Sequence, residues 1–194
     1  MRLLNLIGLL AAFIAIPVQA QWVLDNNSSS LHFVSIKASD IAEIHRFNSL
    51  TGMIEDDGSV TVEIELASVD TLIPIRDERM REMLFETSIF PVATMTTRID
   101  PALTQSLKPG DSTRLTSEVL IELHGEAAPT IVELKAVRVS DNQVLVTSDK
   151  PVVINVGMFN MVDGLEALRS VAGLPSISKA VPVTFNLIFE QEGA

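Results

Sequence analysis

Cysteine and tyrosine are absent from this chain of 194 residues, and tryptophan occurs once. Without cysteine there is no disulfide, no thiolate metal ligand, no cysteine nucleophile and no lipid-modified cysteine anchor. Without tyrosine, one common proton donor of active sites is missing. Basic residues are also few, because 14 Lys and Arg stand against 25 Asp and Glu, a formal net charge of -11. Nucleic-acid affinity comes mainly from Lys and Arg contacts to phosphates, so we expect no nucleic-acid partner.

The short motifs of common enzyme classes are missing as well. The sequence has no GxSxG, no Walker-type loop and no GxGxxG, and its three histidines lack the spacing of a metal site. We therefore predict that the protein is not an enzyme, with no catalytic residue, no metal and no cofactor. We expect His32 and His45, on neighbouring strands, to be able to face each other, and His124 to point outward.

The amino-terminal segment has the pattern of a secretory signal. An apolar run over residues 3–16 follows Arg2, and small residues stand at positions 18–20. A membrane-spanning helix takes roughly 20 apolar residues, more than this run contains, and no later stretch qualifies. We predict a cleaved signal peptide over residues 1–20 and an exported mature domain over residues 21–194.

Alternation of apolar and polar residues is the main pattern of the mature chain. Over residues 60–66, Val, Ile and Leu alternate with Thr and Glu, so one face of the strand is apolar and the other is wet. Turn-forming pairs such as Pro109-Gly110 separate the alternating runs. The predicted strands are residues 22–24, 31–37, 42–54, 59–67, 93–99, 114–124, 130–139 with 143–156, and 181–190.

Antiparallel strands that follow one another in sequence and are apolar on one face favour a closed sheet, because closure leaves no unpaired edge. We therefore predict an all-β fold, an up-and-down antiparallel β-barrel of about eight strands. A two-sheet sandwich is the alternative. Strands of about eight residues, tilted by about 40°, would give a barrel about 20 Å tall.

Two segments have helical periodicity instead. Residues 78–85 follow Pro74, and their methionines and leucine recur at helical spacing. Residues 163–172 begin with a possible capping box, formed by Asp163 and Glu166. We predict two short α-helices that cover one open end of the barrel.

The densest charge cluster lies in the first of these helices. Its simplest interpretation is an ion pair between Asp77 and Arg81, four residues apart on one helix face. The alternative is functional: Arg76 or Arg79 lines the mouth of a cavity and binds the polar or anionic head of a ligand, because the planar guanidinium donors suit phosphate or carbonyl oxygens.

Several stretches share their pattern with a known family. They are LHFVSIKASDIAEIHRFNSLTGMI, VTVEIELASVDTLIPIRDERMREMLFE, FPVATM, LIELHGEAAP and MFNMVDGLEALRSVAGLPSISKAVPVTFNLIF, and together they span nearly all of residues 31–189. The most specific are SVDT followed by IRDERMR and FP, and the later GLEALRSVAG. On these motifs the chain resembles the YceI-like family of exported polyisoprenoid-binding proteins.

This resemblance implies a lipocalin-like barrel whose elongated apolar cavity holds an isoprenoid such as a ubiquinone or a polyprenyl phosphate. It further implies a periplasmic carrier protein that binds an isoprenoid or other long-chain amphiphile. An enzyme that modifies an isoprenoid lipid and a stress-related interaction protein stay open as alternatives, as does a homodimer. At a height of about 20 Å, we expect ligands beyond about five isoprene units to gain little affinity per added unit.

The predicted ligand-binding residues are the apolar side chains expected to face the cavity. They are Phe33, Val62, Ile64, Leu66, Met80, Met83, Leu84, Met95, Val119, Ile121, Met158, Phe159, Leu165, Leu168, Phe185 and Leu187. Arg76 and Arg79 are the predicted head-group residues.

Overall fold

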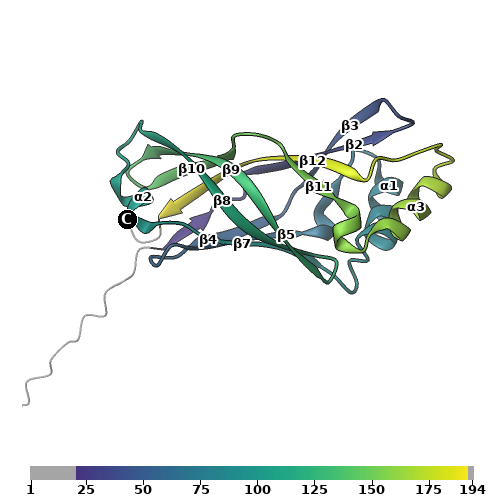
Figure 1. Cartoon of the computed structure of the whole chain (residues 1–194), viewed down its shortest axis with the longest axis horizontal. Coiled ribbons are helices and arrows are strands. Elements are labelled where there is room, and N and C mark those ends of the chain that lie inside the picture. Colours follow the sequence, from purple (N-terminus) through teal and green to yellow (C-terminus); the bar gives the residue numbers. More distant parts are fainter. Residues whose placement is uncertain (1–20, 192–194) are drawn as a thin grey trace, which may run out of the picture.

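An antiparallel sheet closed on itself dominates the computed structural model, which describes residues 21–191 apart from the side chains of residues 104 and 105 (Figure 1). The predicted signal peptide, residues 1–20, lies outside the described residues. The strands are β1 Trp22–Leu24, β2 Ser30–Lys37, β3 Ile41–Phe47, β4 Leu50–Ile54, β5 Ser59–Glu65, β6 Val69–Asp70, β7 Val92–Arg98, β8 Ser112–Leu123, β9 Glu126–Ser140, β10 Gln143–Ser148, β11 Val152–Asn155 and β12 Ala180–Gln191. The helical elements are η1 Leu66–Ser68, α1 Pro74–Arg79, η2 Met80–Leu84, α2 Pro101–Ser106, η3 Val156–Phe159 and α3 Val162–Val171.

Eight strands form the ring, in the order β1-β4-β5-β7-β8-β9-β10-β12. It closes where Trp22 of β1 pairs with Ile54 of β4 on one side and with Gln191 of β12 on the other. The predicted up-and-down barrel is confirmed, because neighbouring strands are antiparallel and the sheet returns to its first strand. Closure satisfies the hydrogen bonds that two free edges would leave open.

At one end of the barrel the strands continue past the ring. β12 pairs there with β2 on one side and with β11 on the other, and β2 pairs with β3 to form a hairpin. Figure 1 shows this β2–β3 hairpin projecting from the same end of the barrel that carries α1 and α3. The hairpin and these helices therefore share one end of the barrel. They contribute polar and charged side chains there, in contrast to the apolar interior.

The barrel is taller along β8 and β9 than the sequence suggested. β8 and β9 pair along their whole facing length, from Ser112 with Val137 to Leu123 with Glu126. A strand of 12 residues tilted by about 40° spans about 30 Å. This pair exceeds the predicted height of about 20 Å, which assumed about eight residues per strand, whereas β4, β5, β7 and β10 have only five to seven residues.

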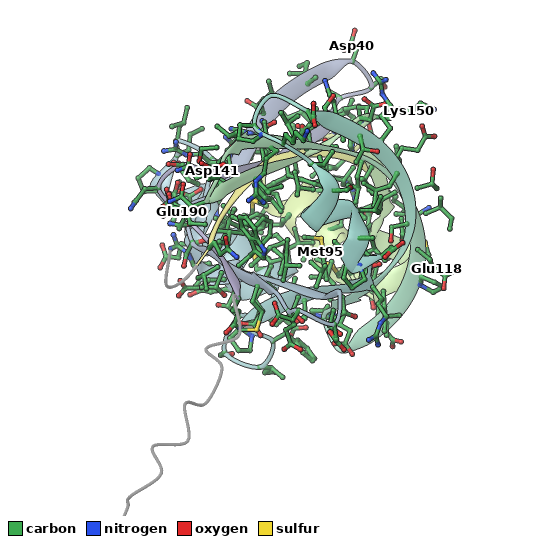
Figure 2. The ribbon with its side chains drawn as sticks, turned by 90° about the vertical axis from the view of Figure 1, so that its left-hand side faces the viewer. Asp40, Met95, Glu118, Asp141, Lys150 and Glu190 are labelled. Carbon is green, nitrogen blue, oxygen red and sulfur yellow. The ribbon has the colours of Figure 1, made fainter. Side chains whose placement is uncertain are left out.

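The pleat places the predicted apolar faces inside. In β5, Val62 and Ile64 are buried while Glu63 and Glu65 are exposed, as the alternation predicted. Figure 2 looks along the barrel from the end opposite α1 and shows Met95 within the ring of strands, with Glu118 outside it. The inner faces of the strands therefore form one continuous apolar lining.

Helical structure occurs in both predicted segments, but the first differs from the predicted α-helix over residues 78–85: α1 ends at Arg79 and continues directly into the π-helical turn η2. α3 packs on η2 at Gly164, where a Cβ atom would lie 2.3 Å from the carbonyl oxygen of Met83. Glycine is required at this position because the two backbones touch. α2, at the opposite end of the barrel in Figure 1, was not predicted, although Asp100 caps it by accepting a hydrogen bond from Ala102 N at 2.9 Å.

The predicted capping box at the start of α3 is wrong. The N-cap position is Met161, Asp163 lies inside the first turn, and Glu166 pairs with Arg169 at 2.6 Å. The helix starts earlier than predicted because Asn160, in the left-handed region at φ 54°, ends the preceding turn η3. Within residues 21–191, no helix has the length and apolar character needed to cross a bilayer.

Candidate ligand-binding cavity

The barrel encloses a predominantly apolar cavity of about 510 Å³. Inward-facing side chains of the strands form its wall, and α1, η2 and α3 contribute further residues at one end. Cavities of roughly 300 to 1,000 Å³ hold most small-molecule ligands of proteins. A barrel of eight strands is either filled by its own side chains or leaves room for one small ligand. This barrel is of the second kind.

Most of the predicted wall residues face this cavity. They are Phe33, Val62, Ile64, Leu66, Met80, Leu84, Met95, Val119, Ile121, Leu165, Leu168, Phe185 and Leu187. Their contact with a ligand stays a prediction. Alternation was sufficient to place those that lie in strands, because each strand has one inner face, whereas Leu66, Met80, Leu84, Leu165 and Leu168 lie in helical elements.

Three predicted wall residues do not face the cavity. Met158 lies in η3 and is 51% exposed, and Phe159 is buried in the core behind the wall. Met83 lies on the side of η2 toward α3, where its backbone contacts Gly164. These positions were predicted from residue type, and the short helical turns η2 and η3 point them elsewhere.

Polar side chains gather where the β2–β3 hairpin meets α1. Glu43 joins two cations, because its Oε2 atom lies 2.8 Å from Lys37 Nζ and 2.7 Å from Arg76 Nη1. All three residues line the cavity. The hydrogen bond from Lys37 is the largest cause that lowers the pKa of the Glu43 carboxyl, so Glu43 is ionised and offsets one of the two positive charges.

Arg76 uses each of its nitrogens within the protein. Its Nε donates to Thr71 Oγ1 at 2.8 Å and its Nη2 to the Thr71 carbonyl oxygen at 2.6 Å, in addition to the Nη1 bond to Glu43. The Thr71 backbone N–H and hydroxyl donate to the buried carboxylate of Asp77 at 2.8 and 2.5 Å. This network fixes the loop before α1.

The ion pair predicted between Asp77 and Arg81 does not form. Arg81 Nε instead donates to the carbonyl oxygen of Ala67 at 2.7 Å, and Asp77 is occupied by Thr71. Arg79 also lines the cavity, and its guanidinium has no ion pair or hydrogen bond to any residue of the described part of the chain. Of the two predicted head-group residues, Arg79 is thus the one whose guanidinium N–H groups are available to a ligand.

His45 is a buried polar residue in the cavity wall, only 4% exposed. Its Nε2 lies 2.8 Å from Ser35 Oγ, and its ring lies 5.2 Å from that of Phe33. Burial, and after it the charge of Arg76, lowers the pKa of His45 below the ordinary 6.5. The imidazole is therefore neutral at pH 7 and adds no charge to the polar end of the cavity.

The other histidines depart from expectation. His32 pairs with Arg46, while His45 pairs with Phe33, so the two imidazoles lie on opposite faces of the hairpin and do not face each other. His124, predicted to point outward, has a side chain only 8% exposed, with Nε2 2.8 Å from Glu86. No three His, Asp or Glu side chains of the described residues are grouped to hold a metal ion.

Sequence reasoning missed the polar residues that β2 and β3 contribute to the wall, Ser35, Lys37, Glu43 and His45. The signal was available: Ser35 and Lys37 continue the inward series of Leu31 and Phe33 along β2. The sequence prediction assigned cavity positions to apolar residues only, whereas the pleat of a strand does not depend on residue type.

The cavity opens beside α1. Ile73 and Ile75 both line it, yet they are 44% and 53% exposed. Leu174, in the segment between α3 and β12, also belongs to the wall and is half-buried. The mouth therefore lies between α1 and this segment, next to the polar cluster around Glu43.

The sequence of this barrel matches a known protein family. A profile of the YceI-like domain matches residues 22–189. The chain belongs to the YceI-like family. Its barrel superimposes on a polyisoprenoid binding domain from Saccharophagus degradans, described as implicated in plant cell wall breakdown, with a TM-score of 0.86 and 36% identity over 89% of this chain and 98% of that one.

Two further solved structures share the fold at low identity. BcnA of Burkholderia cenocepacia has a TM-score of 0.66 at 16% identity, covering 85% of this YceI-like chain and 98% of its own. The YCEI protein of Campylobacter jejuni has a TM-score of 0.55 at 13% identity, covering 77% and 85%. Among curated protein sequences, none matches this chain significantly.

Proposed function

We propose that this YceI-like protein is a periplasmic carrier that holds one isoprenoid lipid in its barrel. The observation that carries the proposal is an apolar cavity of about 510 Å³ with a polar cluster at its open end. That arrangement suits a ligand with a long hydrocarbon tail and one polar head. The relative from Saccharophagus degradans, 36% identical, is described as a polyisoprenoid binding domain, which supports the same ligand class.

The charges at the mouth favour an anionic head group, because three cations line the cavity and one carboxylate opposes them. Glu43 offsets part of the positive charge of Lys37 and Arg76, and His45 is neutral. Arg79 is the one cavity-lining cation with no partner among the described residues. A quinone offers neutral carbonyl acceptors and leaves the charge of Arg79 uncompensated, whereas a phosphate brings between one and two negative charges that offset it. We therefore place a polyprenyl phosphate head ahead of a ubiquinone-type head.

A binding role is favoured over catalysis because the described cavity residues include no nucleophile with a fully oriented base. The His–Ser contact between His45 and Ser35 lacks a carboxylate to orient the imidazole through its second nitrogen, since Nδ1 has no partner within residues 21–191. Binding without turnover leaves the lipid chemically unchanged, and that outcome separates a carrier from an enzyme.

The test is a binding titration with matched ligands. A ubiquinone and a polyprenyl phosphate of equal tail length are titrated against the wild-type protein, Arg79→Gln and the control Arg98→Gln, whose exposed guanidinium pairs with Asp57 away from the cavity. Loss of a charged hydrogen bond predicts a roughly tenfold weaker polyprenyl phosphate affinity for Arg79→Gln and no change for the control.

Three results would contradict the proposal in different ways. If neither lipid binds, the protein is not an isoprenoid carrier. Tighter binding of the ubiquinone overturns the head-group assignment and keeps the carrier. Recovery of a chemically altered lipid after incubation indicates an enzyme.

A further inference from the structure

Leu72, next to the cavity-lining Ile73, combines an unusual backbone conformation with an exposed apolar side chain. It is 83% exposed, and its φ of 64° lies in the left-handed region that a bulky side chain disfavours. The surrounding hydrogen bonds impose this conformation: Leu72 N donates to Asp70 Oδ1 at 2.9 Å, while Arg76 and Asp77 hold Thr71. The fold thus maintains a strained loop that presents a large apolar side chain to solvent.

Other exposed apolar side chains adjoin it. Ile73 and Ile75 follow in the chain, and Ile41, 49% exposed, lies two residues from Glu43 on the same face of β3. Glu43 pairs with Arg76 of α1, so this part of β3 lies beside the helix. We call Ile41, Leu72, Ile73 and Ile75 the apolar rim.

The apolar rim is continuous with the interior, because Ile73 and Ile75 belong both to the rim and to the cavity wall. While the rim stands in solvent, a hydrocarbon tail that enters or leaves the mouth must pass through water. With the rim pressed into lipid, the tail moves from one apolar phase to another, and the cost of hydrating its CH₂ groups is avoided.

We propose that the apolar rim docks the protein on the surface of a lipid bilayer, with the cavity mouth facing the acyl chains. This inference rests on the proposed lipid-carrier function. The charges bordering the rim are mixed, with Lys37 and Arg79 beside Asp40 and Glu78, and the whole chain has a net charge of -11. Such a border complements head groups that carry both a phosphate and an amine, and the net charge opposes docking on an anionic surface. The partner is therefore a zwitterionic bilayer.

The test is sedimentation of the protein with phosphatidylcholine vesicles. Leu72→Asn removes the apolar side chain, and asparagine tolerates a positive φ, so this variant should fold with an equal or higher thermal midpoint. We expect it to bind vesicles about tenfold more weakly than the wild type. The matched control is Ile131→Asn, which removes an equally apolar residue, 64% exposed on β9, and should bind vesicles as the wild type does.

Equal vesicle binding by Leu72→Asn and the wild type overturns the proposal, as does stronger binding once phosphatidylglycerol is added. If Leu72→Asn instead abolishes a dimer seen in the absence of vesicles, the rim binds a second copy and the bilayer assignment is wrong. Uptake of a short-tailed ubiquinone from solution is measured in parallel. If the protein binds vesicles but takes up no ubiquinone, the carrier function is refuted and the docking proposal stands. If it takes up ubiquinone but does not bind vesicles, the docking proposal is refuted and the carrier function stands.

Discussion

Varying the length of the isoprenoid tail tests how much of the ligand the cavity holds. β8 and β9 pair over 12 residues, which sets a barrel height of about 30 Å at a tilt of about 40°. An extended isoprene unit adds four chain bonds, or about 5 Å at an ordinary carbon–carbon bond length. About six units therefore fit along these longest strands, against about four in a barrel about 20 Å tall.

The free energy per unit follows from the same geometry. Burial of five carbons gives at most about 4 kcal/mol per isoprene unit, and ordering of the flexible tail offsets much of it. A net gain of only about 1.4 kcal/mol per unit still means tenfold in Kd. We expect Kd to fall by about tenfold per unit while the tail lies inside the apolar wall, and then to change little for units that bend or protrude.

The assay is a competition series in which quinones with one common head and increasing tail length displace a fluorescent apolar probe. A plateau beyond about six units supports a tail that runs the full height of the barrel. An undiminished gain at eight or more units would refute that limit, and equal affinity for all tails would show that the barrel interior does not hold the tail.

Two further predictions concern single residues. Because the pKa of His45 is lowered in the folded state, the unfolded chain binds more protons as the pH falls below 6.5, and stability should drop there by at most about 1.4 kcal/mol per pH unit. Urea denaturation at several pH values should show this dependence of stability on pH in the wild type and in the control His32→Gln, and a weaker dependence in His45→Gln. An equal dependence in all three proteins would contradict the prediction. Gly164→Ala places a Cβ atom 2.3 Å from the Met83 carbonyl oxygen, so α3 must move and the free energy of unfolding should fall by about 1 to 3 kcal/mol. Gly157→Ala, whose Cβ atom would meet only side chains, is the control; equal unfolding midpoints would show that α3 tolerates the displacement.

The strands were predictable because their signal is local. Alternation places Val62 and Ile64 on one face of β5, and closing the sheet turns that face inward without any further information. The same rule held for Val119 and Ile121 in β8. The family resemblance then named a ligand class, which periodicity alone does not contain.

The polar cluster was not predictable in its details, because its contacts join residues far apart in the chain. Arg76 and Arg79 are three residues apart on one helix, yet Arg76 bonds to Glu43 across 33 positions and Arg79 does not. The positive φ of Leu72 likewise depends on Asp77, which binds Thr71 instead of the expected Arg81. Tertiary contacts of this kind override the helix-face pairing that the sequence suggests.

Native mass spectrometry of the protein purified from its own host tests the central claim most directly. The carrier function predicts a one-to-one complex whose added mass matches an isoprenoid lipid, released unchanged on denaturation. A protein that is free of lipid, and that stays free after incubation with an extract of its host's membranes, would contradict it.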